Sequence, residues 1–118
     1  MWLISFFLVL VLESEREWNE ALDEGAPVLI KFTAKWCQPC KRLAPLYSKL
    51  AAQEDFITSG VRFMEVDVDN KSLASVKNQC GVSPIPAMQL WCKGKKVDEF
   101  VGFFPNKLTA LANKAKTL

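Results

Sequence analysis

The sequence contains no histidine, and this absence excludes several kinds of active site. Cys-His and Ser-His nucleophilic catalysis need an imidazole base, and many zinc sites use imidazole ligands. Any proton transfer must therefore use a carboxylate, a lysine, a tyrosine, a thiol or water. The formal net charge is only +2, so charge gives no indication of a nucleic-acid partner.

Cysteine is scarce as well, with four in 118 residues. That density is too low for a small secreted domain held together by disulfides. A zinc site would need a second closely spaced pair, but eleven residues separate Cys80 from Cys92. The spacing therefore disfavours a zinc site made from all four cysteines, and it leaves Cys37 and Cys40 as the candidate reactive pair.

Long hydrophobic runs are lacking too, since the run that begins the chain covers only residues 1–12. A membrane-spanning helix needs about 17–25 apolar residues, and this run also lacks the basic region and cleavage site of a signal peptide. Ser14 and Glu17 form a capping box that predicts a helix start directly afterwards. We therefore expect residues 8–12 to form an edge strand and residues 1–7 to be an apolar extension.

Two interpretations of the 1–7 extension stay open. Either it contacts a membrane or targets the chain, or it is a longer first strand or a packed tail. An exposed apolar segment is also suited to self-association, so oligomerisation stays open. The compartment is equally open between the cytosol and an organelle such as the mitochondrion.

Residues 8–118 have the length of one domain and alternate predicted strands with predicted helices. Runs of bulky and β-branched residues predict strands over 27–33, 61–69, 86–92 and 96–102. The last two are expected to form an antiparallel hairpin. Apolar residues at helical spacing predict helices over about 14–24, 37–53, 71–79 and 106–116. This order predicts an α/β fold with a central mixed sheet and helices on both faces.

Cys37 and Cys40 form a C-x-x-C motif at the predicted junction of a central strand and a helix. Unpaired backbone N–H groups and the positive end of the helix dipole stabilise a thiolate there. Nearby cations act in the same direction: Lys35, Lys41 and Arg42. We therefore predict that Cys37 is the nucleophile and Cys40 the resolving thiol. The alternative is a pair of small buried hydrophobic residues.

The segment FTAKWCQPCKRLAP resembles the active-site segment of thioredoxins, in which W-C-G-P-C is the usual form. The resemblance continues in VRFMEVDVD, in VSPIPAMQLWCKGKKVDEFVG and in the closing helix, and it covers about residues 8–116. It implies the thioredoxin fold, a redox disulfide between Cys37 and Cys40, and protein-disulfide reductase activity without a cofactor. It also implies two kinds of partner, namely proteins with disulfides and a thioredoxin reductase or other dithiol donor.

The resemblance further implies a substrate-binding surface. Trp36 would shield the cysteines, and Pro86 would be the family's cis-proline. Ile85 would offer backbone hydrogen bonds to a bound peptide. The rest of the surface would comprise Gln38, Pro39, Val101, Gly102 and Phe103. For Trp36 and Phe103 the alternative is an ordinary core or surface aromatic residue.

Lys31 departs from the family, because thioredoxins usually carry a buried aspartate at this position. Three roles stay open. A charged Lys31 would stabilise a cysteine thiolate and make the protein more oxidising, whereas a neutral Lys31 would serve as a base. In the third, Lys31 pairs with Glu65 or Asp67 across the sheet and is largely structural. Gln38 departs as well, since it replaces the usual glycine.

These departures keep a second function open, namely a weakly active or redox-silent thioredoxin-like module that binds proteins through the same groove. Outside the motif, we expect Cys92 to be a core residue of a strand. Cys80 stands just before Gly81 at a predicted helix end, and if it is exposed there it would be open to oxidation or dimer formation.

Overall fold

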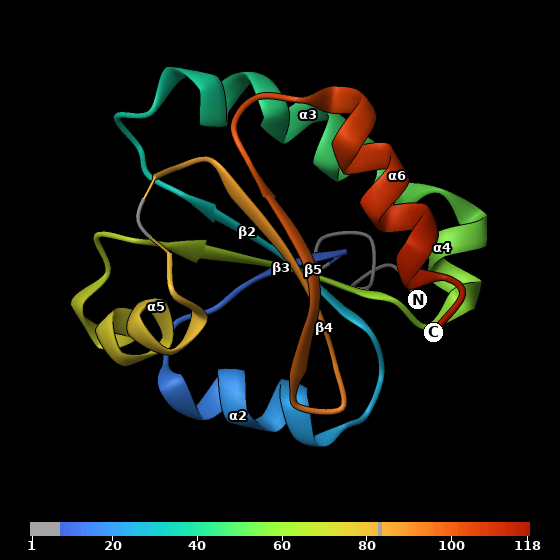
Figure 1. The fold of residues 1–118 in the computed structure, drawn as a ribbon, viewed down its shortest axis with the longest axis horizontal. Coiled ribbons are helices and arrows are strands. Elements are labelled where there is room, and N and C mark those ends of the chain that lie inside the picture. Colours follow the sequence, from blue (N-terminus) through green and yellow to red (C-terminus); the bar gives the residue numbers. More distant parts are fainter. Residues whose placement is uncertain (1–7, 83) are drawn as a thin grey trace.

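The computed structural model of the chain describes residues 8–82 and 84–118 (Figure 1). The apolar extension expected at residues 1–7 lies outside this part, and so does Ser83. Within the described residues, no helix combines the length and the apolar character needed to cross a membrane.

The core of the fold is a five-stranded mixed sheet in the order β1-β3-β2-β4-β5. Its strands are β1 (Val9–Val11), β2 (Val28–Thr33), β3 (Arg62–Asp67), β4 (Ala87–Cys92) and β5 (Lys95–Val101). β1, β3 and β2 run parallel, β4 is antiparallel to β2, and β5 is antiparallel to β4. The predicted mixed sheet is therefore confirmed. β4 and β5 are joined by the two-residue turn Lys93–Gly94, in which both φ values are positive, as expected for a tight hairpin.

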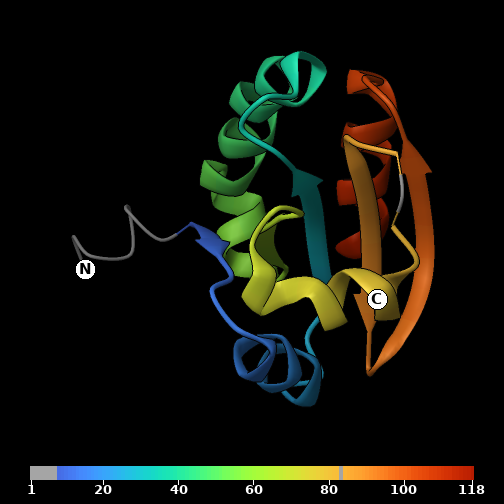
Figure 2. The ribbon, with the colours of Figure 1, turned by 90° about the vertical axis from the view of Figure 1, so that its left-hand side faces the viewer.

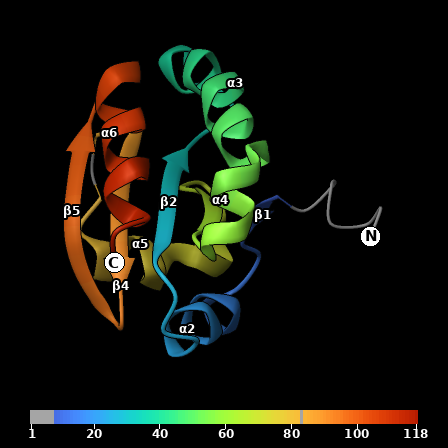
Figure 3. The ribbon, with the colours of Figure 1, turned by 90° about the vertical axis from the view of Figure 1, so that its right-hand side faces the viewer.

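Helices cover both faces of the sheet, as predicted. The α-helices are α2 (Glu15–Asp23), α3 (Gln38–Ala52), α4 (Glu54–Ser59), α5 (Ala74–Cys80) and α6 (Pro105–Ala115), and a 3-10 turn, Lys71–Leu73, precedes α5. Helices α3, α4 and α6 lie on one face, where α3 and α6 are neighbours (Figure 3). Helices α2 and α5 lie on the other (Figure 2). The sequence analysis missed α4, because its six residues contribute a single buried side chain, Phe56, and give no periodic signal.

The start of α2 shows the capping box with one change. The Ser14 hydroxyl accepts a hydrogen bond from the Glu17 N–H at 3.3 Å, as predicted. The Glu17 carboxylate, however, accepts from the N–H of Glu13 at 2.6 Å. Two donors at this helix start are thus satisfied, which fixes where β1 ends and α2 begins.

Strand β2 divides the core into two layers, because successive side chains point to opposite faces. Ile30 and Phe32 pack with residues of α2 and α5, whereas Leu29 packs with residues of α3 and α6. The same alternation places Lys31 on the face of Leu29, beneath α3. All residues of β2 except the last are buried, so this lysine lies in a largely closed layer.

Tyr47 fastens α3 to the two central strands. Its hydroxyl lies 2.8 Å from the carbonyl oxygen of Leu29 and 2.7 Å from that of Met64, and it accepts a hydrogen bond from the Met64 N–H at 3.1 Å. Burial raises the pKa of Tyr47 well above its usual value, and the Glu65 carboxylate acts in the same direction. The phenol therefore keeps its proton and donates to one carbonyl at a time.

We expect Tyr47→Phe to lower the free energy of unfolding by about 1–3 kcal/mol, because the buried Met64 N–H loses an acceptor. Urea unfolding should show a lower midpoint with an unchanged m value. Thr117→Val is the control, since it removes an exposed hydroxyl that also donates to a backbone carbonyl. If the two variants lost the same small amount of stability, the buried hydroxyl would have no special role in holding α3.

Candidate functional site

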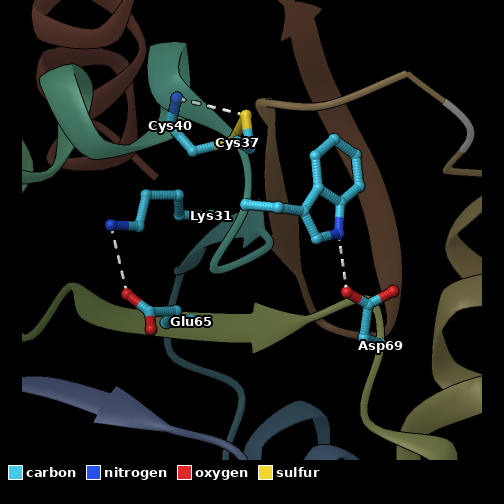
Figure 4. Close-up of a disulfide and its surroundings, with 6 residues drawn as sticks. Lys31, Cys37, Cys40, Glu65 and Asp69 are labelled. Carbon is cyan, nitrogen blue, oxygen red and sulfur yellow. Dashed lines mark hydrogen bonds and ion pairs between the residues drawn. A yellow bond between two sulfur atoms is a disulfide. The ribbon is translucent and has the colours of Figure 1, made fainter.

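Cys37 and Cys40 lie where β2 passes into α3, and the structure joins them in a disulfide (Figure 4). Their Cα atoms are 5.3 Å apart. Cys37 is the N-cap of the helix, and its Sγ accepts a hydrogen bond from the Cys40 N–H at 3.3 Å. Pro39 occupies the first turn, where a residue without an N–H costs nothing. The helix start therefore holds both sulfurs in place.

The disulfide is well covered. Cys37 is 4% exposed and Cys40 is 1% exposed, and both pack with Ala34 in a small apolar cluster. Val68 and Ile85 cover the cluster from the loops after β3 and before β4. A partner disulfide must therefore come into close contact with this surface before it can react.

The electrostatic setting favours a thiolate at Cys37. The sulfur lies at the positive end of a 15-residue helix that has no acidic residue in its first turn. Lys41 and Arg42 follow in the same turn and are exposed. Once the disulfide is reduced, helix dipole and cations stabilise negative charge on Cys37, the species that attacks disulfides.

The loop before β4 and the end of β5 lie together beside the disulfide. The Ile85–Pro86 peptide bond is cis, as the resemblance implied for Pro86. The N–H of Gly102 donates to the carbonyl oxygen of Pro86 at 2.8 Å, and Val101 pairs with Ala87. The fold thus brings Pro86, Val101 and Gly102, which are distant in sequence, to one surface.

Two exposed aromatic residues extend this surface. Trp36 is 67% exposed, and its indole N–H donates to the Asp69 carboxylate at 2.8 Å (Figure 4). Phe103 is also exposed, and the Arg42 guanidinium lies 5.0 Å from its ring centroid. We call the set the docking surface: Trp36, Gln38, Pro39, Ile85, Pro86, Val101, Gly102 and Phe103. Its role in substrate binding stays a prediction.

Asp69 is the residue of this region that the sequence analysis missed. It follows β3, and Trp36 follows β2, and these two strands are parallel neighbours. The carboxyl ends of parallel strands meet at the same edge of a sheet, which is the signal that would have brought the two residues together.

Lys31 lies beneath the helix start and is paired. Its side chain is 4% exposed, and its Nζ lies 3.1 Å from Glu65 Oε1 (Figure 4). Lys31 and Glu65 are direct partners in the register of β2 and β3. The Lys31 ammonium also lies 5.2 Å from the centroid of the Tyr47 ring. Of the two acids considered for this pair, the structure therefore selects Glu65, whereas Asp67 is opposite Thr33.

An open cavity of about 870 Å³ lies on this side of the sheet. Lys31, Cys40 and Glu65 line it, and Val11 of the edge strand forms part of its wall. Cys37 does not line it. The two cysteines thus differ in surroundings, because Cys40 adjoins this cavity and Cys37 adjoins the docking surface.

The thioredoxin family model matches residues 9–117, nearly the whole described chain. The chain belongs to the thioredoxin family. This thioredoxin is 38% identical to human thioredoxin over 109 residues, which cover 91% of this chain and 98% of the human protein. It is 36% identical to the H-type thioredoxin of Chlamydomonas reinhardtii over 110 residues, 90% of this chain and 93% of that one.

Solved structures agree with this assignment. The thioredoxin of Malassezia sympodialis superposes with a TM-score of 0.82 at 28% identity, over 90% of this chain and 89% of that one. Thioredoxin O2 of Arabidopsis thaliana in the oxidised state superposes with a TM-score of 0.77 at 31% identity, over 90% of this chain and 92% of that one. With its closely spaced cysteine pair, this thioredoxin is a thiol–disulfide oxidoreductase of the protein-disulfide reductase class. Its partner classes are protein disulfides and a reductase.

The two remaining cysteines differ from expectation. Cys80 is fully buried among the residues that α5 packs on the sheet, so the exposure considered for it is not found. The cause is helical spacing, because Leu73, Val76 and Cys80 share the inward face and the chain turns away only at Gly81. Cys92 is half-buried rather than a core residue, with its Sγ 3.9 Å from the carbonyl oxygen of Gly25.

Burial raises the pKa of the Cys80 thiol to about 12, against the opposing effect of the Lys96 ammonium. At pH 8 only about 10⁻⁴ of this thiol is then ionised, so we expect no modification of Cys80 by iodoacetamide in the native reduced protein. Peptide mass spectrometry after a short pulse at pH 8 measures this. In urea all four cysteines should react. Native alkylation of Cys80 as fast as that of Cys92 would contradict the burial.

Proposed function

We propose that this thioredoxin reduces protein disulfides with Cys37 as the nucleophile and Cys40 as the resolving thiol. The observation that carries the assignment is the difference between the two sulfurs. Cys37 caps the positive end of α3 beside the docking surface, whereas Cys40 lies one turn further along and adjoins the cavity behind the helix. An incoming disulfide therefore approaches Cys37 first.

The proposed reaction has two exchange steps. The Cys37 thiolate attacks one sulfur of the substrate disulfide, forming a mixed disulfide and releasing the first substrate thiolate. The Cys40 thiol then loses its proton and attacks the Cys37 sulfur, which breaks the mixed disulfide and releases the second substrate thiolate. The substrate gains two electrons and two protons, and the Cys37–Cys40 disulfide is what the dithiol donor later reduces.

The docking surface would hold the substrate during both steps. A bound substrate would cover the exposed side chains of Trp36, Val101 and Phe103. The loop before the cis-proline presents backbone groups beside the cysteines. An extended peptide can pair with such an edge by backbone hydrogen bonds. The Arg42–Phe103 contact joins the segment after β5 to α3, so both segments contribute to the surface.

We expect Cys37→Ser to abolish insulin-disulfide reduction with dithiothreitol as donor, and Cys40→Ser to trap a mixed disulfide at Cys37. Turbidity measures the first, and intact-mass spectrometry measures the second. Cys92→Ser is the matched control and should reduce insulin at the wild-type rate. A wild-type protein no faster than dithiothreitol alone would favour the redox-silent binding module instead.

We propose in addition that residues 1–7, which lie outside the described residues, contact a membrane. Their apolar composition, interrupted only by Ser5, supports this. The full chain should then pellet with membranes, whereas residues 8–118 should stay in the supernatant. Equal distribution of the two chains would contradict the proposal. If the full chain shifts to larger species in size-exclusion chromatography but ignores membranes, the extension drives self-association.

A further inference from the structure

The second exchange step needs an acceptor for the Cys40 proton. The chain has no histidine, and a lysine stands where the family resemblance leads one to expect an aspartate. The acceptor must have access to Cys40 from inside, because the other side of the disulfide is occupied by substrate. The cavity behind α3 provides that access, since Cys40 is part of its wall.

Several ionisable side chains line this cavity. Those that line it besides Cys40 and Glu65 are Glu13, Lys31, Lys35, Lys41, Asp67 and Asp69. A lysine ammonium, such as that of Lys31 in its ion pair with Glu65, has three donors and no acceptor. Tyr47, on the buried face of α3, keeps its proton because burial and the Glu65 charge raise its pKa. The acceptor is therefore a carboxylate.

Two of the four carboxylates accept hydrogen bonds at the turn after β3. Asp69 accepts the indole N–H of Trp36 at 2.8 Å, on the docking surface. Asp67 accepts the N–H of Asp69 at 2.9 Å and so stabilises the turn after β3. Glu13 is exposed at the start of α2, beyond the end of the edge strand β1. Glu65 remains.

The position of Glu65 suits the task. It is opposite Lys31 in the register of the two central parallel strands, and both side chains point to the face that α3 covers. The buried Lys31 ammonium holds its carboxylate at 3.1 Å (Figure 4). The Glu65 side chain is still 26% exposed, so a proton that it receives can pass on to solvent. A cavity of this size, with charged side chains on its wall, also has ample room for bridging water.

Building on the proposed roles of Cys37 and Cys40, we propose that Glu65 accepts the proton of Cys40 through water in this cavity. Lys31 is then a positioning residue that holds the carboxylate in place. In the second step the Cys40 S–H bond breaks, the proton moves to Glu65, and the sulfur electron pair attacks the Cys37 sulfur. The departing substrate thiolate takes a proton from solvent, and Glu65 returns its own to solvent through the open cavity.

The two steps can be separated with 5,5′-dithiobis(2-nitrobenzoate) in stopped flow. Attack by Cys37 releases the first nitrothiobenzoate, and attack by Cys40 releases the second. All variants carry Cys92→Ser, so that the half-buried Cys92 does not contribute to the signal. In Glu65→Gln we expect an unchanged first release and a second release slowed about 10²-fold at pH 6–7. The difference should shrink as the pH rises, because hydroxide then replaces Glu65 as the acceptor of the proton.

Glu65→Gln leaves a buried ammonium without its partner, so a second variant is needed. Lys31→Met combined with Glu65→Gln removes both charges, which proteins often tolerate better than the loss of one partner. It should show the same pH-dependent slowing of the second release. Glu99→Gln is the matched control, because Glu99 pairs with Lys96 at 3.2 Å on β5 and does not line the cavity. Its two releases should match the wild type.

The outcomes distinguish this inference from the proposed function. A second release that is unchanged in both Glu65 variants overturns the role of Glu65 and leaves the roles of the cysteines intact. A slowing of the second release that is equal at every pH also overturns the role of Glu65, because it indicates a structural effect and not the loss of a proton acceptor. If Cys37→Ser still releases the first nitrothiobenzoate, or Cys40→Ser still releases the second, the proposed function itself fails.

Discussion

The site depends on the packing of one helix, α3, across the two central parallel strands. Leu43, Tyr47 and Leu50 of this helix are buried against the sheet, and the Tyr47 hydroxyl contacts backbone groups of both β2 and β3. Because the helix is held at its middle, its N-terminus is fixed above the carboxyl end of β2. The disulfide therefore lies directly over the layer that contains Lys31 and Glu65 (Figure 4).

Burying the Lys31–Glu65 pair carries a desolvation penalty, and packing gives no reason for it. Taking an ammonium out of water carries a large desolvation penalty, and the Coulombic attraction to a carboxylate often does no more than offset it. Two apolar residues at these positions would join the neighbouring core without this penalty. The pair also lies on the wall of a cavity that adjoins Cys40, where buried charge can influence chemistry. Its location therefore favours a functional reason for keeping it.

Most of the fold was predictable because the signals were local and repeated. The alternation along β2, the helical spacing in α3 and the motif at their junction each point to the same architecture. The parts that were missed depend on single residues. Helix α4 has one buried side chain, and the environment of Cys80 depends on the helix continuing one residue further than expected.

The site itself was predictable only in its covalent part. Only two residues separate the cysteines in sequence, so their pairing needs no knowledge of the fold. The partner of Lys31 needed the strand register: either Glu65 or Asp67 fitted the sequence, and a two-residue shift along β3 would have exchanged them. The Trp36–Asp69 hydrogen bond joins two loops whose proximity follows only from the parallel pairing of β2 with β3.

The arrangement separates two tasks that would otherwise compete for one surface. Substrate must cover Cys37 to react, and in doing so it excludes water from the docking surface. The proton of Cys40 must nevertheless leave while the substrate is bound. Because Cys37 adjoins the docking surface and Cys40 adjoins the cavity on the far side of the helix start, both can happen together. A carboxylate on β3 serves such a path as well as one on β2, since both strands end beneath the same helix.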